Sequence, residues 1–267
     1  MIKIEKLTNE LKEKILNLLY TDEVYQVFLI HLIENNQQDI LYINDYTHLE
    51  TILHLKYDGN SYFTNFFTND DKSLLSISNQ LRSLNYKNIL LAGKYEEVKT
   101  IMNFMNKNKA ISLNKYYVYK NNNLKIQVNN SELKRATLDD FDIISLFLID
   151  FFEAKTKNEI DEITDINKIK EDLKNGLYLY QYDSQVIGMG RFSGFSRNYI
   201  DLTTIYINPK NRNKGHGKKL MQNMILTALD LNKTPVTQTA VKNIYAKRAY
   251  ESLGFVPIND YSFEFIT

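Results

Sequence analysis

The sequence predicts an α/β fold built as two similar halves, each with a sheet flanked by helices. Short apolar runs of strand length alternate with amphipathic stretches of helical spacing along all 267 residues. The order of these elements is similar before and after an asparagine-rich segment at 121–130. Because a chain of this length has room for two small domains, we expect two copies of one fold.

The first half is expected to open with a strand at 3–5 and helices at 9–20 and 22–34. Apolar runs bounded by turn residues then predict three strands, the last two separated by a turn at 58–60. These strands lie at 40–43, 52–55 and 62–66, and they are followed by a helix at 71–84, a strand at 89–92, a helix at 95–107 and a strand at 115–119.

The second half begins with a strand at 133–136 and a helix whose start is marked by Thr137, a good N-cap, with Asp140 three residues later. An acidic stretch at 159–165 follows and is most simply a solvated surface, although it would also attract a cationic amine. The other expected elements are a helix at 166–175, strands at 176–181, 185–192 and 198–207, a helix ending at Asp230, a strand at 235–240, a helix at 243–253 and a strand within 261–266.

The asparagines at 121–123 and 129–130 are poor in packing side chains and rich in turn formers, so we place the domain boundary there. The expected domains are 1–125 and 131–267. The formal net charge is +1, which gives no sign of a nucleic-acid partner. No run approaches the roughly 20 apolar residues of a membrane span, and no signal peptide is evident at the start. The absence of cysteine favours a cytoplasmic protein, and the four histidines form no metal-ligand pattern.

One loop carries the chemistry. After the strand ending at Ile207, two glycines separated by one residue lead directly into a helix. Gly215 and Gly217 let the backbone approach a ligand closely, and the first turn of the helix offers uncovered N–H groups. Five cations and no acid lie within 210–219, which suits a diphosphate. Taken alone, however, the loop is equally a tight turn before a solvated basic helix.

Two sequence motifs resemble the signatures of one known family. Residues 207–217 resemble the coenzyme-A pyrophosphate motif of the GNAT N-acetyltransferase superfamily, whose core is Arg/Gln-x-x-Gly-x-Gly/Ala after a strand end. Residues 243–255 resemble its second signature, Asn-x-x-Ala-x-x-x-Tyr-x-x-x-Gly-Phe. The resemblance covers about 131–267. The first half lacks the glycine loop, since 67–72 is acidic where a phosphate needs donors, and it resembles the degenerate copy of tandem family members.

The resemblance implies the GNAT fold, with a mixed and mostly antiparallel central sheet, and acetyl-CoA as co-substrate. The backbone of Ile205, Tyr206 and Ile207 would pair with the acetyl-pantetheine arm like an added strand. Asn243 is either a helix N-cap or a contact to that arm. Amides of the loop would hold the diphosphate, and they belong to Arg212, Asn213, Lys214, Gly215, His216, Gly217 and Lys218. The His216 side chain is expected to face solvent or phosphate and is a poor candidate base.

Tyr250 falls on the tyrosine of the second signature, which implies a general acid that protonates the coenzyme-A thiolate. It also shares an apolar helix face with Leu253, so a purely structural core tyrosine is the alternative. The base is open between Asp201, on the strand leading to the cofactor, and Glu153, at the end of the first helix of this domain. Each is otherwise a solvent-facing acid.

The function expected is transfer of the acetyl group of acetyl-CoA directly to an amine of a small molecule, without a covalent enzyme intermediate and without a metal. The absence of cysteine agrees with this. A non-catalytic acyl-CoA-binding or regulatory module, and an acyltransferase for longer acyl chains, are the alternatives. The chain is expected to act as a monomer or homodimer, away from membranes and nucleic acid.

Overall fold

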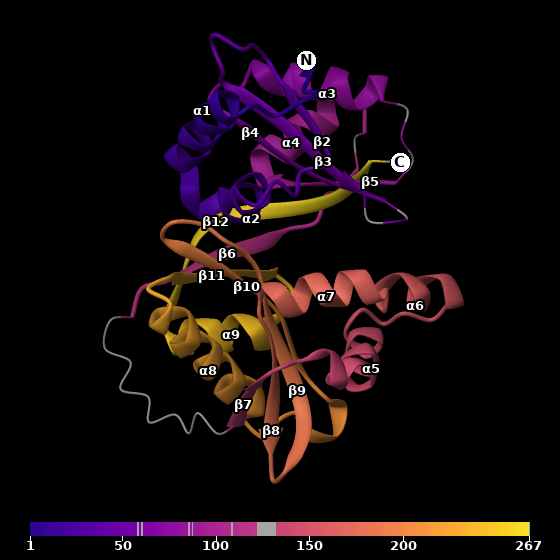
Figure 1. Ribbon diagram of the computed structural model, residues 1–267, viewed down its shortest axis with the longest axis vertical. Coiled ribbons are helices and arrows are strands. Elements are labelled where there is room, and N and C mark those ends of the chain that lie inside the picture. Colours follow the sequence, from indigo (N-terminus) through magenta and orange to yellow (C-terminus); the bar gives the residue numbers. More distant parts are fainter. Residues whose placement is uncertain are drawn as a thin grey trace. The chain divides into compact units, whose positions relative to one another are not determined.

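The computed structural model describes all residues except 58, 60, 85, 87, 108, 122–131 and 267. Two units make up the chain, and each is assembled from segments that are distant in the sequence. Unit 1 consists of Met1–Tyr117, Gln238–Asn243 and Pro257–Thr267, and unit 2 consists of Val118–Thr237 and Ile244–Val256. Figure 1 shows the elements of both units, coloured along the sequence from indigo at the N-terminus to yellow at the C-terminus.

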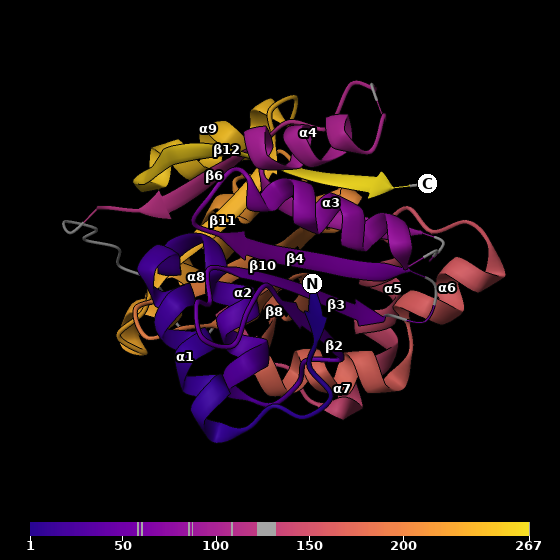
Figure 2. The ribbon, with the colours of Figure 1, turned by 90° about the horizontal axis from the view of Figure 1, so that it is seen from above.

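Unit 1 is a mixed sheet with helices on both faces. Its strand order is β1-β2-β3-β4-β5-β12-β6, in which β4 and β5 are parallel and the other registered pairs are antiparallel. Helices α1 and α2 cover one face of β2–β4, and α3 and α4 cover the other (Figure 2). Its elements are β1 (Ile2–Lys3), α1 (Asn9–Leu19), α2 (Glu23–Glu34), β2 (Ile40–Ile43), β3 (Thr51–Tyr57), β4 (Tyr62–Thr68), α3 (Ser73–Ser83), β5 (Ile89–Lys94), α4 (Tyr95–Phe104), β6 (Asn114–Tyr119) and most of β12 (Phe255–Ile266).

Unit 2 repeats this plan. Its strand order is β11-β10-β9-β8-β7, and only β10 and β11 are parallel. Helices α5–α7 lie on one side of β8–β10 and α8–α9 on the other (Figure 1). Its elements are β7 (Leu133–Arg135), α5 (Phe141–Phe151), α6 (Lys157–Ile163), α7 (Ile166–Asn175), β8 (Leu177–Tyr182), β9 (Gln185–Phe195), β10 (Tyr199–Ile207), α8 (His216–Asp230), the first part of β11 (Thr234–Ala240) and α9 (Ile244–Leu253).

The predicted fold class is confirmed, because each sheet is mixed, mostly antiparallel and flanked by helices. The predicted capping of the first helix region of unit 2 is also present: the Asp140 carboxylate accepts the backbone N–H of Thr137 at 2.9 Å. The acidic stretch at 159–165, for which no secondary structure was predicted, is partly helical. Its first part forms α6, which is started by a second capping box in which Glu159 accepts the N–H of Thr156 at 2.8 Å.

The predicted domain limits do not coincide with the two units. The limits at 125 and 131 lie outside the described residues, as do most of the boundary asparagines and the turn positions 58 and 60. Residues 238–243 and 257–267, expected in the second domain, belong to unit 1. The physical reason for the second of these is strand pairing, because Tyr261–Ile266 of β12 pair antiparallel with Ile89–Lys94 of β5.

Within the described part of the chain, no helix has both the length and the apolar character to cross a membrane. The same residues contain no group of three or more histidines and acids close enough to hold a metal ion.

Candidate functional site

The glycine loop joins β10 to α8 in unit 2. Gly215 caps α8 with a φ of 82°, and a Cβ at this position would meet no atom within 4 Å. The left-handed backbone, rather than crowding, is therefore what requires glycine. The first backbone bond of α8 runs from the Lys219 N–H to the Gly215 carbonyl at 3.2 Å. The N–H groups of His216, Gly217 and Lys218 precede that bond, at the positive end of the helix dipole, and can bind an anion.

The backbone at the second glycine of the loop is also uncrowded. A Cβ added at Gly217 would meet only Ile207 Cγ1, at 3.9 Å, so the folded chain itself would tolerate a side chain there. At Gly217, a group that approaches the amides from outside would account for the bare backbone. The Lys214 ammonium donates to the Lys210 carbonyl at 3.1 Å, which holds a cation beside the loop.

Arg212 folds back onto β10 instead of extending from the loop. Its Nε donates to the Ile207 carbonyl at 2.8 Å, and its guanidinium lies 5.5 Å from the centre of the Tyr206 ring and 3.3 Å from Asp150 Oδ2. The Tyr206 hydroxyl donates to the same carboxylate oxygen at 2.5 Å, and burial, with this carboxylate, raises the pKa of Tyr206. Asp150, on α5, thus ties a helix to the loop. Sequence reasoning missed it because no motif marks an acid so far from the loop along the chain.

The expectation that the His216 side chain faces solvent or phosphate is wrong about solvent. Only 5% of His216 is exposed. Its ring centre lies 4.4 Å from that of Tyr182, and Nδ1 lies 3.5 Å from the Tyr180 hydroxyl. Burial, with Lys219 and Lys214 nearby, lowers the pKa of His216 and favours the neutral ring. The ring therefore packs against the tyrosines of β8, and the backbone N–H of His216 is the group of this residue that could bind an anion at the start of α8.

Strand β10 continues past its partner on one side. Its parallel register with β11 ends at the pair Asp201 and Val236, whereas the strand itself runs on to Ile207. On the other side, Tyr206 and Ile207 pair with β9. The predicted backbone contacts of Ile205, Tyr206 and Ile207 therefore lie on a stretch of β10 whose register with β11 has ended, which is where an added strand could pair.

Asp201 lies in a half-buried polar cluster where the register of β9 and β10 shifts. Ser193, the extra residue of β9 at that shift, donates a hydrogen bond to Asp201 Oδ2. Burial raises the pKa of Asp201 to about 6, although Ser193 and the charge of Arg191 act in the opposite direction. A carboxylate that titrates near neutrality is suited to accept and release protons.

Tyr250 belongs to the same cluster. Burial raises its pKa above the usual 10, the charge of Asp201 adds to this, and a hydrogen bond with Thr237 acts against it. Thr237 Oγ1 donates to the Leu202 carbonyl at 2.8 Å. The structure thus brings together Asp201 and Tyr250, the two acid–base candidates that lie 49 positions apart in the sequence.

The remaining candidates are placed differently. Glu153 follows α5 with an exposed side chain and a φ of 54°, and its N–H donates to the Asp150 carbonyl at 3.3 Å, so it terminates the helix. No described contact joins it to Asp201 or Tyr250. Asn243 is exposed and directly precedes α9, with its N–H donating to the Ala240 carbonyl at 2.8 Å, which agrees with an N-cap position.

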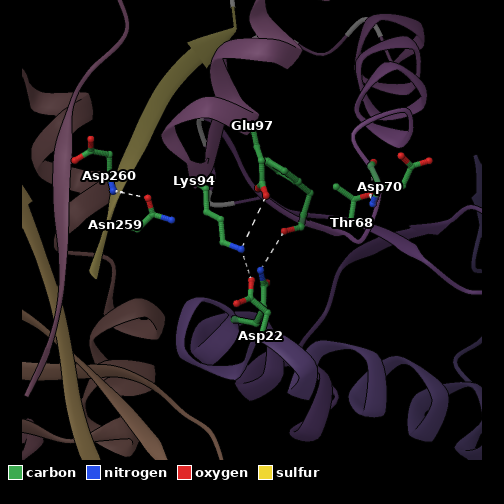
Figure 3. A network of polar contacts seen from close by, with 9 residues as sticks. Asp22, Thr68, Asp70, Lys94, Glu97, Asn259 and Asp260 are labelled. Carbon is green, nitrogen blue, oxygen red and sulfur yellow. Dashed lines mark hydrogen bonds and ion pairs between the residues drawn. The ribbon is translucent and has the colours of Figure 1, made fainter. Parts of the chain in front are cut away.

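The corresponding loop of unit 1 binds its own side chains. Asp70 Oδ1 accepts the Lys72 N–H at 3.0 Å, and Thr68 Oγ1 accepts the Asp70 N–H at 3.1 Å, just before α3 (Figure 3). Nearby, the Lys94 ammonium lies 2.6 Å from Asp22 and 4.0 Å from Glu97 (Figure 3). In this loop an internal acid, Asp70, therefore occupies a backbone amide just before the helix.

Residues 141–255 match the model of the acetyltransferase (GNAT) family. This segment forms a GNAT domain. The match spans the glycine loop, Asp201, Tyr250 and the α5 residue Asp150, so all of the cluster described above lies within the GNAT domain. None of the curated proteins compared matches the sequence.

Solved structures share the fold of the whole chain. An acetyltransferase of the GNAT family from Colwellia psychrerythraea is 15% identical, with all of both chains covered and a TM-score of 0.63. A tandem GNAT protein from the clavulanic acid biosynthesis pathway is 9% identical, covers 99% of this chain and 97% of its own, and has a TM-score of 0.66. A GCN5-related N-acetyltransferase-like protein from Streptococcus suis is 13% identical, with 95% and 98% covered and a TM-score of 0.55. At these identities the likeness concerns the fold alone, and it extends over both units.

Proposed function

We propose that the GNAT domain transfers the acetyl group of acetyl-CoA directly to an amine of a small molecule. The proposal is supported by three features of unit 2 taken together: a helix start with N–H groups that precede the first helix bond, a β10 stretch beyond its register with β11, and the half-buried Asp201 and Tyr250. The diphosphate would be held by the amides of 212–218, and the pantetheine arm would follow the backbone of 205–207.

Two side chains then carry the proton transfers. Asp201, through water, takes the proton that the amine loses as its nitrogen attacks the thioester carbonyl and the new C–N bond forms. Tyr250 gives its proton to the sulfur as the C–S bond breaks, and its raised pKa keeps that proton in place up to this step. The co-substrate supplies the activated thioester. Glu153, exposed at the end of α5, is the less suitable base.

The test is release of free thiol from acetyl-CoA across a panel of small amines, with Tyr250→Phe as the variant. Loss of a general acid should lower kcat by roughly 10- to 100-fold. The KM for acetyl-CoA should change by less than about twofold, because the hydroxyl is needed only when charge develops on sulfur. An unchanged kcat removes Tyr250 from the mechanism. Tight binding of acetyl-CoA without turnover of any amine would favour a non-catalytic binding module, and faster turnover of longer acyl-CoA would change the donor.

A further inference from the structure

Strand β10 contains a backbone irregularity. Thr203 pairs with Arg191 of β9, and the next registered pair is Tyr206 with Met189. Three steps along β10 therefore match two along β9, which places one extra residue in β10. The extra residue falls at Thr204–Ile205, within the stretch proposed to lead to the acyl arm.

The repeated fold does not require this bulge. In unit 1 the equivalent pair of strands, β3 and β4, runs in continuous register from Thr51 and Thr68 to Tyr57 and Tyr62. The unit without the glycine loop thus has a regular strand, and the unit with the loop has an irregular one. Bulges are frequent beside active sites, where they redirect the backbone.

The bulge is strained and has a specific support. Thr204 has a φ of 51°, in the left-handed region that a β-branched residue rarely adopts, and it is 5% exposed. Such a conformation persists only when the surroundings hold it. Arg191 Nε donates to Thr204 Oγ1 at 2.9 Å, and the Arg191 guanidinium forms an ion pair with Asp172 of α7. The bulge is therefore tied through one arginine to a helix.

We propose that Arg191 is a positioning residue for acyl-CoA binding, which holds Thr204 in its left-handed conformation so that the β10 backbone at 204–206 is presented to the acyl-pantetheine arm. The inference rests on the proposed function of the GNAT domain. Arg191 acts through Thr204 and does not contact the co-substrate. Its planar fork serves both partners at once, since Nε faces the threonine and the terminal nitrogen faces Asp172.

Two substitutions of Thr204 separate the effect of the hydrogen bond from Arg191 from the effect of the strained backbone at this residue. Thr204→Val keeps the shape and the strain but removes the oxygen that Arg191 holds, whereas Thr204→Gly removes the strain, because glycine adopts this φ freely. Arg191→Met keeps the length of the side chain but removes the donor. The dissociation constant of acetyl-CoA, measured by calorimetry without an acceptor, should rise about tenfold in Thr204→Val and in Arg191→Met, the size expected for a hydrogen bond from a charged donor. It should rise less in Thr204→Gly.

The deciding measurement is rescue. Adding Thr204→Gly to Arg191→Met should recover most of the lost affinity, and amide exchange at 203–207 should be faster than wild type in Thr204→Val. At saturating acetyl-CoA, kcat of Thr204→Val should fall less than its KM rises. Wild-type affinity in both Thr204→Val and Arg191→Met, or the absence of rescue by glycine, overturns the proposal while leaving the proposed function standing. If Arg191→Met does not fold, the contrast between Thr204→Val and Thr204→Gly decides alone. Failure of the wild-type chain to bind acetyl-CoA overturns the proposed function and this inference together.

Discussion

Replacing Asp201 by asparagine should make the protein more stable and less active at the same time. Burial raises the pKa of Asp201 to about 6 in the folded chain, whereas an unperturbed aspartate titrates near 4. A carboxyl group whose pKa is higher when folded binds its proton more readily in the folded state. Its charged form therefore costs stability, fully above pH 6 and progressively less as the pH falls from about 6 toward 4. With one pKa unit worth about 1.4 kcal/mol, the cost is at most roughly 2–3 kcal/mol at neutral pH.

The asparagine keeps the shape of the side chain and an oxygen that can accept from Ser193, so it removes the charge and little else. Urea unfolding at pH 7.5 should show Asp201→Asn to be about 1–3 kcal/mol more stable than wild type, and at pH 4 or below the difference should nearly vanish. Thiol release under saturating substrates should fall at least tenfold if Asp201 is the base. Equal stability at both pH values would refute the burial argument, and full activity of the variant would refute the assignment of the base. Ser193→Ala, which keeps the carboxylate, is the matched control.

Three further results are expected. The kcat/KM value should rise with pH up to about pH 6, because Asp201 must be unprotonated to act as the base. It should then stay level toward pH 10, because the raised pKa of Tyr250 keeps the phenol protonated. A fall in kcat/KM between pH 7 and 9 would contradict this. Gly215→Ala should lower the free energy of unfolding by about 1–2 kcal/mol through its φ of 82° and also weaken acetyl-CoA binding, with Gly215→Asn losing less stability; calorimetry and urea unfolding measure both. Glu153→Gln should leave kcat within about twofold of wild type, and a tenfold loss would reinstate Glu153 as the base. Glu153→Gly should raise the free energy of unfolding by about 0.5–1 kcal/mol, because glycine adopts the φ of 54° at this position without strain.

Local patterns were enough to predict most elements. The helix at 166–175 and the strand ending at Ile207 have the bounds expected, because caps, glycines and apolar spacing act within a few residues. The long β12 was predicted only in its last part. Pro257, Asn259 and Asp260 have the composition of a turn, and the strand extends through them only because neighbouring strands pair with it.

Some residues of the candidate site could likewise be predicted from local sequence, and others could not. The glycine loop and Tyr250 could be predicted because each belongs to a motif of consecutive residues. Asp150 and Arg191 could not, since each acts through a partner far away in the sequence, Arg212 for the first and Thr204 for the second. The direction of the His216 ring could not be predicted either, because the two tyrosines that pack against it come from β8, more than 30 residues before α8.

The pairing of Tyr261–Ile266 with β5 has a consequence for how the protein is made. A ribosome releases the chain from its N-terminus, and a first domain usually folds while the next is still being synthesised. Unit 1 includes both the first residue of the chain and Pro257–Thr267. Its sheet therefore gains β12 only after the GNAT domain at 141–255 has been synthesised, so the edge of β5 stays open to pairing with other chains until then.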